Sequence, residues 1–125
     1  MSDLASGRAE QEAGVEFCVL IVDDDPDMAG LLGRMLVQQG MRAHVAENGS
    51  AALQMIAASP PDLVLLDVQM PGPSGFDICR QLKSQEATAL LPVVLVTALE
   101  DQDSRVRGIE AGADDFLSSR CAARN

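Results

Sequence analysis

The chain carries five short segments with the residue pattern of β-strands. Three of them are continuous apolar runs followed by polar or turn-forming residues, which is typical of strands buried on both faces. A fourth segment alternates between polar and apolar residues, and the fifth is a short run near the end of the chain. The predicted strands are Phe17–Val22, Arg42–Glu47, Leu63–Leu66, Val93–Val96 and Asp115–Ser118.

Four segments between the strands carry apolar residues at helical spacing. Asp25 and Pro26 are the residue types of an N-cap and a first helical position, and Gly40 is placed to end the first helix as a left-handed cap. In the fourth predicted helix we expect Val106 and Ile109 to face the core. The predicted helices span residues 26–39, 49–59, 76–84 and 103–111.

Strands and helices alternate along the chain, and the strands are too apolar to have one side in solvent. This order predicts an α/β fold with a parallel sheet, helices on both faces and right-handed crossovers. The common arrangement of five such strands is the flavodoxin-like, doubly wound sheet with strand order 2-1-3-4-5. We expect one domain over residues 16–125, preceded by a mobile tail at residues 1–15 that lacks periodicity.

The composition narrows the classes of partner. The chain has 125 residues, enough for one domain with a core, and a formal net charge of -10 at pH 7. This charge argues against direct binding to nucleic acid or to an anionic membrane, but it is compatible with a bound divalent cation. No signal-peptide pattern is present and the three cysteines lack metal-ligand spacing, so we expect a cytoplasmic protein with reduced thiols.

Polar residues follow three of the predicted strands. Asp23 and Asp24 follow the first strand, Asp67 follows the third and Thr97 follows the fourth. Taken singly, each is an ordinary loop or capping residue, but the order 2-1-3-4-5 brings these strand ends to one edge of the sheet. Oxygen ligands without a nearby His or Cys favour Mg²⁺. A carboxylate beside Mg²⁺ can act as a nucleophile and form an aspartyl phosphate, with Thr97 donating a hydrogen bond to a phosphoryl oxygen.

Five stretches in a fixed order strengthen this interpretation, although each is a weak signal alone. They are Val19–Pro26, Leu65–Gly72, Gly75-Phe76, Val96–Ala98 and Gly112–Leu117. In order and separation they resemble the receiver domain of bacterial two-component response regulators. The resemblance extends from about Phe17 to Ser118.

The resemblance implies roles for the acidic residues. Asp67 would accept a phosphoryl group from a sensor histidine kinase or a phosphotransfer protein. Mg²⁺ would be bound by Asp24, by Asp67 and by the backbone carbonyl of Gln69, with Asp23 acting through water. The chain would then be a phosphoacceptor regulatory domain and not an enzyme, apart from slow self-dephosphorylation.

The resemblance also implies two switch residues. The hydroxyl of Thr97 would move toward the phosphoryl group, and Phe116 would swing inward as Thr97 moves. A core phenylalanine without a switching role is the competing interpretation of Phe116. His44 is the only histidine and lies on the second predicted strand, so we expect it at the surface and not as a phosphodonor.

The chain departs from the family after the last strand. The family has a Lys-Pro pair there, and this chain has Ser119 and Arg120. Ser119 cannot supply the cationic contact of the Lys to the phosphoryl group, and Arg120 at the next position is a candidate for a partial substitute. The final helix of the family is also missing before Asn125.

Two explanations fit this departure. Either the chain is cut or altered after about residue 118, or it is a degenerate receiver that no longer switches. The intact acidic residues favour the first. In both cases we expect an exposed apolar flank at the last strand, with lower stability or self-association as the result.

Two other functions compete with phosphoacceptance. A degenerate receiver acting as a phosphorylation-independent binding module would bind Mg²⁺ weakly or not at all. A phosphohydrolase with an Asp nucleophile commonly needs a second acid two residues after the nucleophile, where this chain has Gln69. We therefore expect a signalling domain, with any output domain absent from this chain.

Overall fold

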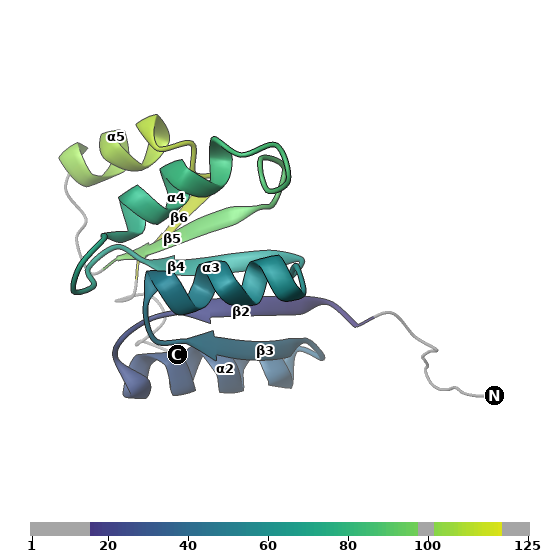
Figure 1. Ribbon diagram of the computed structural model, residues 1–125. Coiled ribbons are helices and arrows are strands. Elements are labelled where there is room, and N and C mark those ends of the chain that lie inside the picture. The colour runs from purple at the N-terminus through teal and green to yellow at the C-terminus, as the bar shows by residue number, and fades with distance from the viewer. Residues whose placement is uncertain (1–15, 98–101, 119–125) are drawn as a thin grey trace.

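The computed structural model describes residues 16–97 and 102–118, and all nine predicted elements occur there (Figure 1). The first strand begins at Cys18, one residue later than predicted. Phe17 lies just before the strand, and its side chain is 46% exposed. No helix in the described part of the chain is long and apolar enough to cross a membrane. The strands are β2 (Cys18–Val22), β3 (Arg42–Ala46), β4 (Leu63–Asp67), β5 (Val93–Thr97) and β6 (Asp115–Ser118). The helices are α2 (Pro26–Gln38), α3 (Gly49–Ala58), α4 (Gly75–Lys83) and α5 (Gln102–Glu110).

The strands form one parallel sheet with the order β3-β2-β4-β5-β6. Counted along the chain, this is 2-1-3-4-5, so the predicted flavodoxin-like, doubly wound fold is confirmed. The helix that follows β2 and the helix that follows β4 cover opposite faces of the sheet. The connections therefore diverge at the carboxyl ends of these two neighbouring strands and leave a crevice there.

Alternate residues of the strands enter two apolar cores, one on each face of the sheet. On β2, Leu20 and Val22 belong to the core that includes residues of α3 and α4, whereas Val19 and Ile21 belong to the core covered by α2. In Figure 1, α3 lies in front of the sheet and α2 lies behind β3. Each buried aliphatic side chain contributes about 1.5–3 kcal/mol, and a one-residue slip would exchange the two sets, so the register is strongly specified.

Helix α5 turns small residues, and not its large apolar ones, toward the sheet. Ser104 and Gly108 are buried, whereas Val106 is 43% exposed and Ile109 is 71% exposed. The prediction that Val106 and Ile109 face the core is therefore wrong. The reason is the ring of Phe116 on β6, because a Cβ atom on Gly108 would overlap that ring. Only a residue without a side chain fits between α5 and this ring.

An ion pair ties α4 to the beginning of β5. Lys83 Nζ donates to the carbonyl of Leu91 at 2.7 Å and to Asp114 Oδ2 at 2.8 Å. The same Asp114 oxygen accepts the N–H of Val93 at 2.8 Å. Partial burial alone would raise the pKa of Asp114, but the hydrogen bonds from Lys83 and Val93 hold it below its usual value. This contact fixes the start of the strand that ends at Thr97.

Gly75 allows α4 to begin directly against the end of β4. Its N–H donates to the carbonyl of Val68 at 3.0 Å, and a Cβ atom at this position would overlap the carbonyl oxygen of Asp67. Ser74 and Asp77 form a capping box at the same helix end. The segment after Asp67 is therefore held between a strand end and a capped helix.

Three segments of the chain, residues 1–15, 98–101 and 119–125, lie outside the described residues. The predicted mobile tail, the domain boundaries, the missing final helix and the position of Ser119 therefore stay predictions. Self-association through the last-strand flank also stays a prediction.

The close approach at Gly75 generates a testable expectation. Gly75→Ala should lower the free energy of unfolding by about 2–3 kcal/mol, because the added methyl group must displace the backbone at Asp67. Gly30→Ala is the matched control, since a Cβ atom there has no neighbour closer than 3.5 Å, and it should stabilise the domain by about 0.5–1 kcal/mol. Urea unfolding of both variants measures this, and equal effects would contradict the packing described here.

Candidate functional site

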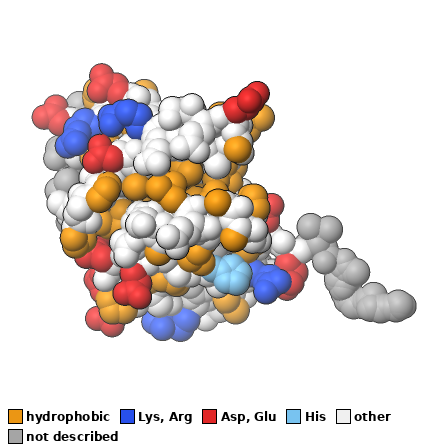
Figure 2. All heavy atoms as spheres, viewed as in Figure 1, with side chains coloured by type: hydrophobic (Ala, Val, Ile, Leu, Met, Phe, Trp, Pro, Cys, Tyr) orange, Lys and Arg blue, Asp and Glu red, His pale blue; other side chains and the backbone are white. Residues whose placement is uncertain are grey.

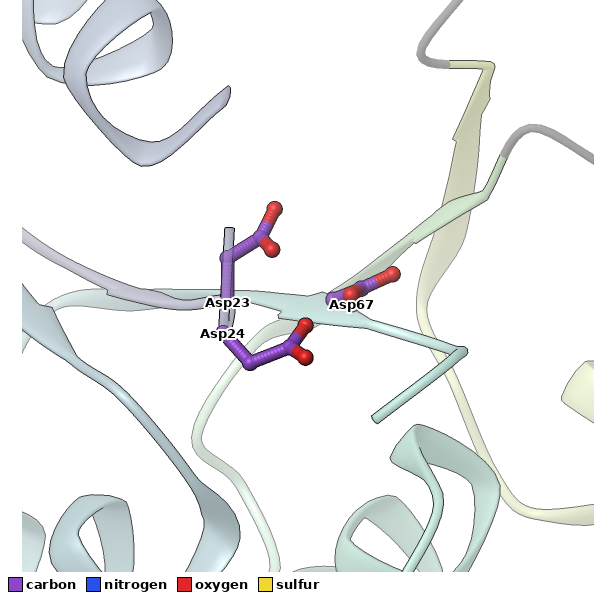
Figure 3. A group of neighbouring side chains, drawn as sticks. All are labelled: Asp23, Asp24 and Asp67. Carbon is purple, nitrogen blue, oxygen red and sulfur yellow. The ribbon is translucent and has the colours of Figure 1, made fainter. Parts of the chain in front are cut away.

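Three carboxyl groups meet at the crevice between β2 and β4 (Figure 3). Asp23 and Asp24 directly follow β2, and Asp67 is the last residue of β4. One carboxylate oxygen from each side chain lies within 4.8 Å of the other two. The structure thus brings together residues that are more than forty positions apart in the sequence.

Backbone N–H groups orient two of these side chains. Asp23 is 6% exposed, and its Oδ1 accepts the N–H of Asp25 at 2.9 Å. Asp67 is half-buried, and its Oδ1 accepts the N–H of Gln69 at 3.2 Å. Asp24 is exposed at the mouth of the crevice. The three carboxylates therefore range from a buried side chain to one in contact with solvent.

The N-terminus of α2 explains why the chain turns sharply after Asp24. Asp25 is the N-cap, as predicted, and its Oδ1 accepts the N–H of Asp27 at 3.0 Å. Pro26 occupies the first turn of the helix. The carboxylate of Asp25 is therefore engaged by its own helix, and Asp23 and Asp24 are the two that turn toward Asp67.

Burial and mutual repulsion change the acidity of the cluster. Burial first, and then the charge of Asp23, raise the pKa of Asp67 to about 7. Burial also raises the pKa of Asp23. Close carboxylates cannot all ionise at low cost, so near neutral pH the cluster holds a proton unless a cation neutralises it.

A cavity of about 320 Å³ surrounds the cluster. Thr97, which is 3% exposed at the end of β5, lines it together with the three carboxylates. Gln69 forms its exposed rim. The carboxylate, hydroxyl and amide groups that these side chains offer suit a hard divalent cation, and no described Cys or His lines the cavity.

Two other predicted residues lie outside this cavity. Phe116 is on β6, opposite Leu95 of β5, and its half-buried ring packs against Gly108. His44 is exposed on β3, as expected, at the opposite edge of the sheet from β6. Ser119 is outside the described residues.

Sequence reasoning missed two features near the site. Met28 on α2 lines the acidic cavity, and the only signal was its place on the apolar face of the helix. Arg107 on α5 lies over the ring of Phe76, with 4.4 Å between its Cζ atom and the ring centroid. No local pattern announces this contact, because it joins two helices that are far apart in the sequence.

The chain matches one family model and several curated proteins. The model of the response regulator receiver domain matches residues 19–125. The chain is 44% identical over 100 residues to the response regulator PleD of Caulobacter vibrioides, which covers 80% of this chain and 22% of PleD. It is 40% identical over 106 residues to the sensory transduction protein RegX3 of Mycobacterium tuberculosis, covering 85% of this chain and 45% of RegX3. The chain thus spans less than half the length of these relatives.

Solved structures give the same result. The BeF3-activated N-terminal receiver domain of RstA from Klebsiella pneumoniae superposes with a TM-score of 0.75 at 33% identity, covering 86% of this chain and 93% of that one. The signal receiver domain of a signal transduction histidine kinase from Syntrophus aciditrophicus has a TM-score of 0.75 at 35% identity, covering 86% and 87%. The family model's match to residues 19–125 includes the strand ends that carry the acidic cluster.

The raised pKa of Asp67 predicts how stability depends on pH. Between about pH 4 and 7 the metal-free native state holds a proton at Asp67 that the unfolded chain has lost, so stability falls as pH rises through this range. Asp67→Asn removes this loss and should raise the free energy of unfolding at pH 8 by about 1–2 kcal/mol, with little gain below about pH 4.

Urea unfolding in a metal chelator over this pH range measures the effect. Glu86→Gln, which alters an exposed carboxylate in the loop after α4, is the control and should change stability by less than about 0.5 kcal/mol at every pH. An Asp67→Asn effect that does not vary with pH would contradict the proposed protonation.

Proposed function

This chain belongs to the response regulator receiver domain family, and from that premise we propose that Asp67 is the residue that accepts a phosphoryl group. The domain is the receiver domain of a two-component response regulator, and receiver domains are regulatory. The observation that carries the proposal is the convergence of Asp23, Asp24 and Asp67 beside a buried Thr97. Asp67 suits the acceptor role because it ends the central strand and is partly desolvated.

The cation we propose for this site is Mg²⁺. Asp24 and Asp67 would bind it directly, with the backbone carbonyl of Gln69, and Asp23 would act through water. When bound, the metal neutralises negative charge on the transferring phosphoryl group. The oxygen-only donors and the mutual repulsion of the carboxylates support this choice, because a hard cation relieves that repulsion.

The phosphoryl transfer itself requires an ionised Asp67. A carboxylate oxygen of Asp67 attacks the phosphorus of a phosphohistidine, the new O–P bond forms as the P–N bond breaks, and the leaving imidazole takes up a proton. Because the pKa of Asp67 is about 7 without metal, loss of its proton accompanies cation binding. The donor we propose is a sensor histidine kinase or a phosphotransfer protein, and the product loses its phosphoryl group only slowly.

Thr97 and Phe116 are the residues that we propose respond to phosphorylation. Thr97 lines the acidic cavity at the end of β5, and the neighbouring strand β6 carries Phe116. The ring of Phe116 packs against Gly108, and Arg105 Cζ lies 5.8 Å from the ring centroid. A shift of Thr97 toward a phosphoryl group would change the space beside this ring.

Exposure to acetyl phosphate with Mg²⁺ tests the acceptor. Intact-mass measurement should show one phosphoryl group on the chain, and none on Asp67→Asn or after chelation of the metal. Asp24→Asn should slow the reaction at least tenfold, because the remaining donors bind the cation less tightly. Glu47→Gln, at the end of β3 and outside the cluster, is the matched control and should react as the unaltered chain does.

If the unaltered chain never gains the mass of a phosphoryl group, the proposal is wrong. An equal adduct on Asp67→Asn would move the acceptor to another residue. Because Ser119 occupies the family Lys position, the reaction is followed over hours as well as minutes.

The switch is tested separately by NMR of the Phe116 ring. Phosphorylation should shift the ring resonances of Phe116 in the unaltered chain. In Thr97→Ser, which keeps the hydroxyl, the shift should persist, and in Thr97→Ala it should be lost while Asp67 is still phosphorylated. No ring shift in the unaltered chain would leave Phe116 as a core residue without a switching role, and an identical shift in all three chains would show that its response does not depend on Thr97.

A further inference from the structure

Arg107 is a cation whose N–H donors have no partner among the described residues. Its Cζ atom lies 4.4 Å from the centroid of the Phe76 ring, and Phe76 is 2% exposed, so the guanidinium covers a ring that is otherwise buried. Arg107 forms no salt bridge or side-chain hydrogen bond within residues 16–97 and 102–118. Contact with an aromatic face orients a guanidinium and leaves its in-plane N–H groups available for a carboxylate or a phosphate.

Arg107 lines a second cavity that adjoins the acidic one. This cavity has a volume of about 460 Å³ and is lined by the segment after β4, by Phe76 and by Arg107. Gln69 lines both cavities, so the two are neighbours at this residue. Ser74 also lines the second cavity, but its hydroxyl is engaged in the capping box of α4. The available donors are therefore the guanidinium of Arg107 and the side-chain amide of Gln69.

The charge around the acceptor makes this cation significant. A phosphodonor is an anion, and it must approach three carboxylates on a chain with a net charge of -10. Among the described residues, Arg107 is the one Lys or Arg that lines either cavity. Figure 2 shows basic side chains gathered over α5, with acidic ones beside them. The family Lys position beyond β6 holds Ser119, so that position supplies no cation.

We propose that Arg107 and the side chain of Gln69 form an anion-binding site that receives the phosphate group of a small phosphodonor before transfer to Asp67. This inference rests on the proposed function, because it gives the second cavity a role in the same reaction. Arg107 acts by holding and orienting the donor, and it exchanges no atoms with it. It raises the local concentration of an anion that the carboxylates would otherwise repel.

Binding is tested first without any phosphoryl transfer. On metal-free Asp67→Asn, which cannot accept the group, inorganic phosphate is titrated at constant ionic strength while the Nε–H of arginine side chains is followed by NMR. The Arg107 signal and the side-chain amide of Gln69 should shift together in a saturable way, and Arg80 on the exposed face of α4 should not. Shifts of equal size at Arg80 and Arg107, or none at Arg107, would overturn the proposal.

Kinetics with acetyl phosphate and with phosphoramidate, whose P–N bond resembles that of phosphohistidine, test the role in transfer. Arg107→Gln should raise the donor concentration for half-maximal phosphorylation about threefold to tenfold with the saturating rate unchanged, because one charged hydrogen-bonding group is lost. Arg107→Lys should recover part of the effect. Arg80→Gln carries the same charge change and should match the unaltered chain.

The possible outcomes distinguish the anion-binding site at Arg107 from the proposed phosphoryl acceptor, Asp67. Phosphorylation of Asp67 with no dependence on residue 107 would reject the anion site and leave the acceptor in place. Phosphate binding at Arg107 without any phosphorylation of the unaltered chain would reject the acceptor and keep the anion site. If Arg107→Gln changes the kinetics with only one of the two donors, acetyl phosphate or phosphoramidate, Arg107 does not recognise the phosphate group that both share, and the proposal is wrong.

Discussion

Repulsion among three carboxylates is the interaction on which the site depends. Their oxygens lie within 4.8 Å of one another, and this arrangement is stable only if a proton or a cation offsets the charge. Burial raises the pKa of Asp67 to about 7 and also raises the pKa of Asp23, so the site holds a proton near neutral pH. If Asp67 is the phosphoryl acceptor that we propose, a bound cation would favour the ionised carboxylate that acts as the nucleophile.

Apolar packing of the sheet opposes the repulsion and keeps the three carboxylates close together. Strands β2 and β4 are neighbours with both faces buried, so neither can slide to separate Asp24 from Asp67 without exposing apolar residues. On one side the N-cap of α2 turns the chain, and on the other Gly75 lets α4 begin against the end of β4. The burial of apolar residues in the sheet therefore offsets the free-energy cost of the charge repulsion.

Much of this was predictable from the sequence because its signals were local. Apolar runs, Asp25-Pro26 and Gly40 at a helix end identified the elements, and the alternation of strands and helices indicated the sheet order. The facing of α5 was not predictable, since it depends on the Phe116 ring that excludes a side chain at Gly108. The contact of Arg107 with Phe76 could not be predicted for the same reason, because packing alone brings these distant segments together.

Titration of the Asp67 carboxyl carbon by ¹³C NMR, with and without Mg²⁺, measures most directly whether the carboxylate cluster holds a proton that a cation displaces. We expect a pKa of about 7 in the metal-free chain, and a lower pKa once saturating Mg²⁺ is present. A metal-free pKa near the ordinary aspartate value of about 4 would contradict it. A raised pKa that Mg²⁺ does not change would contradict it as well.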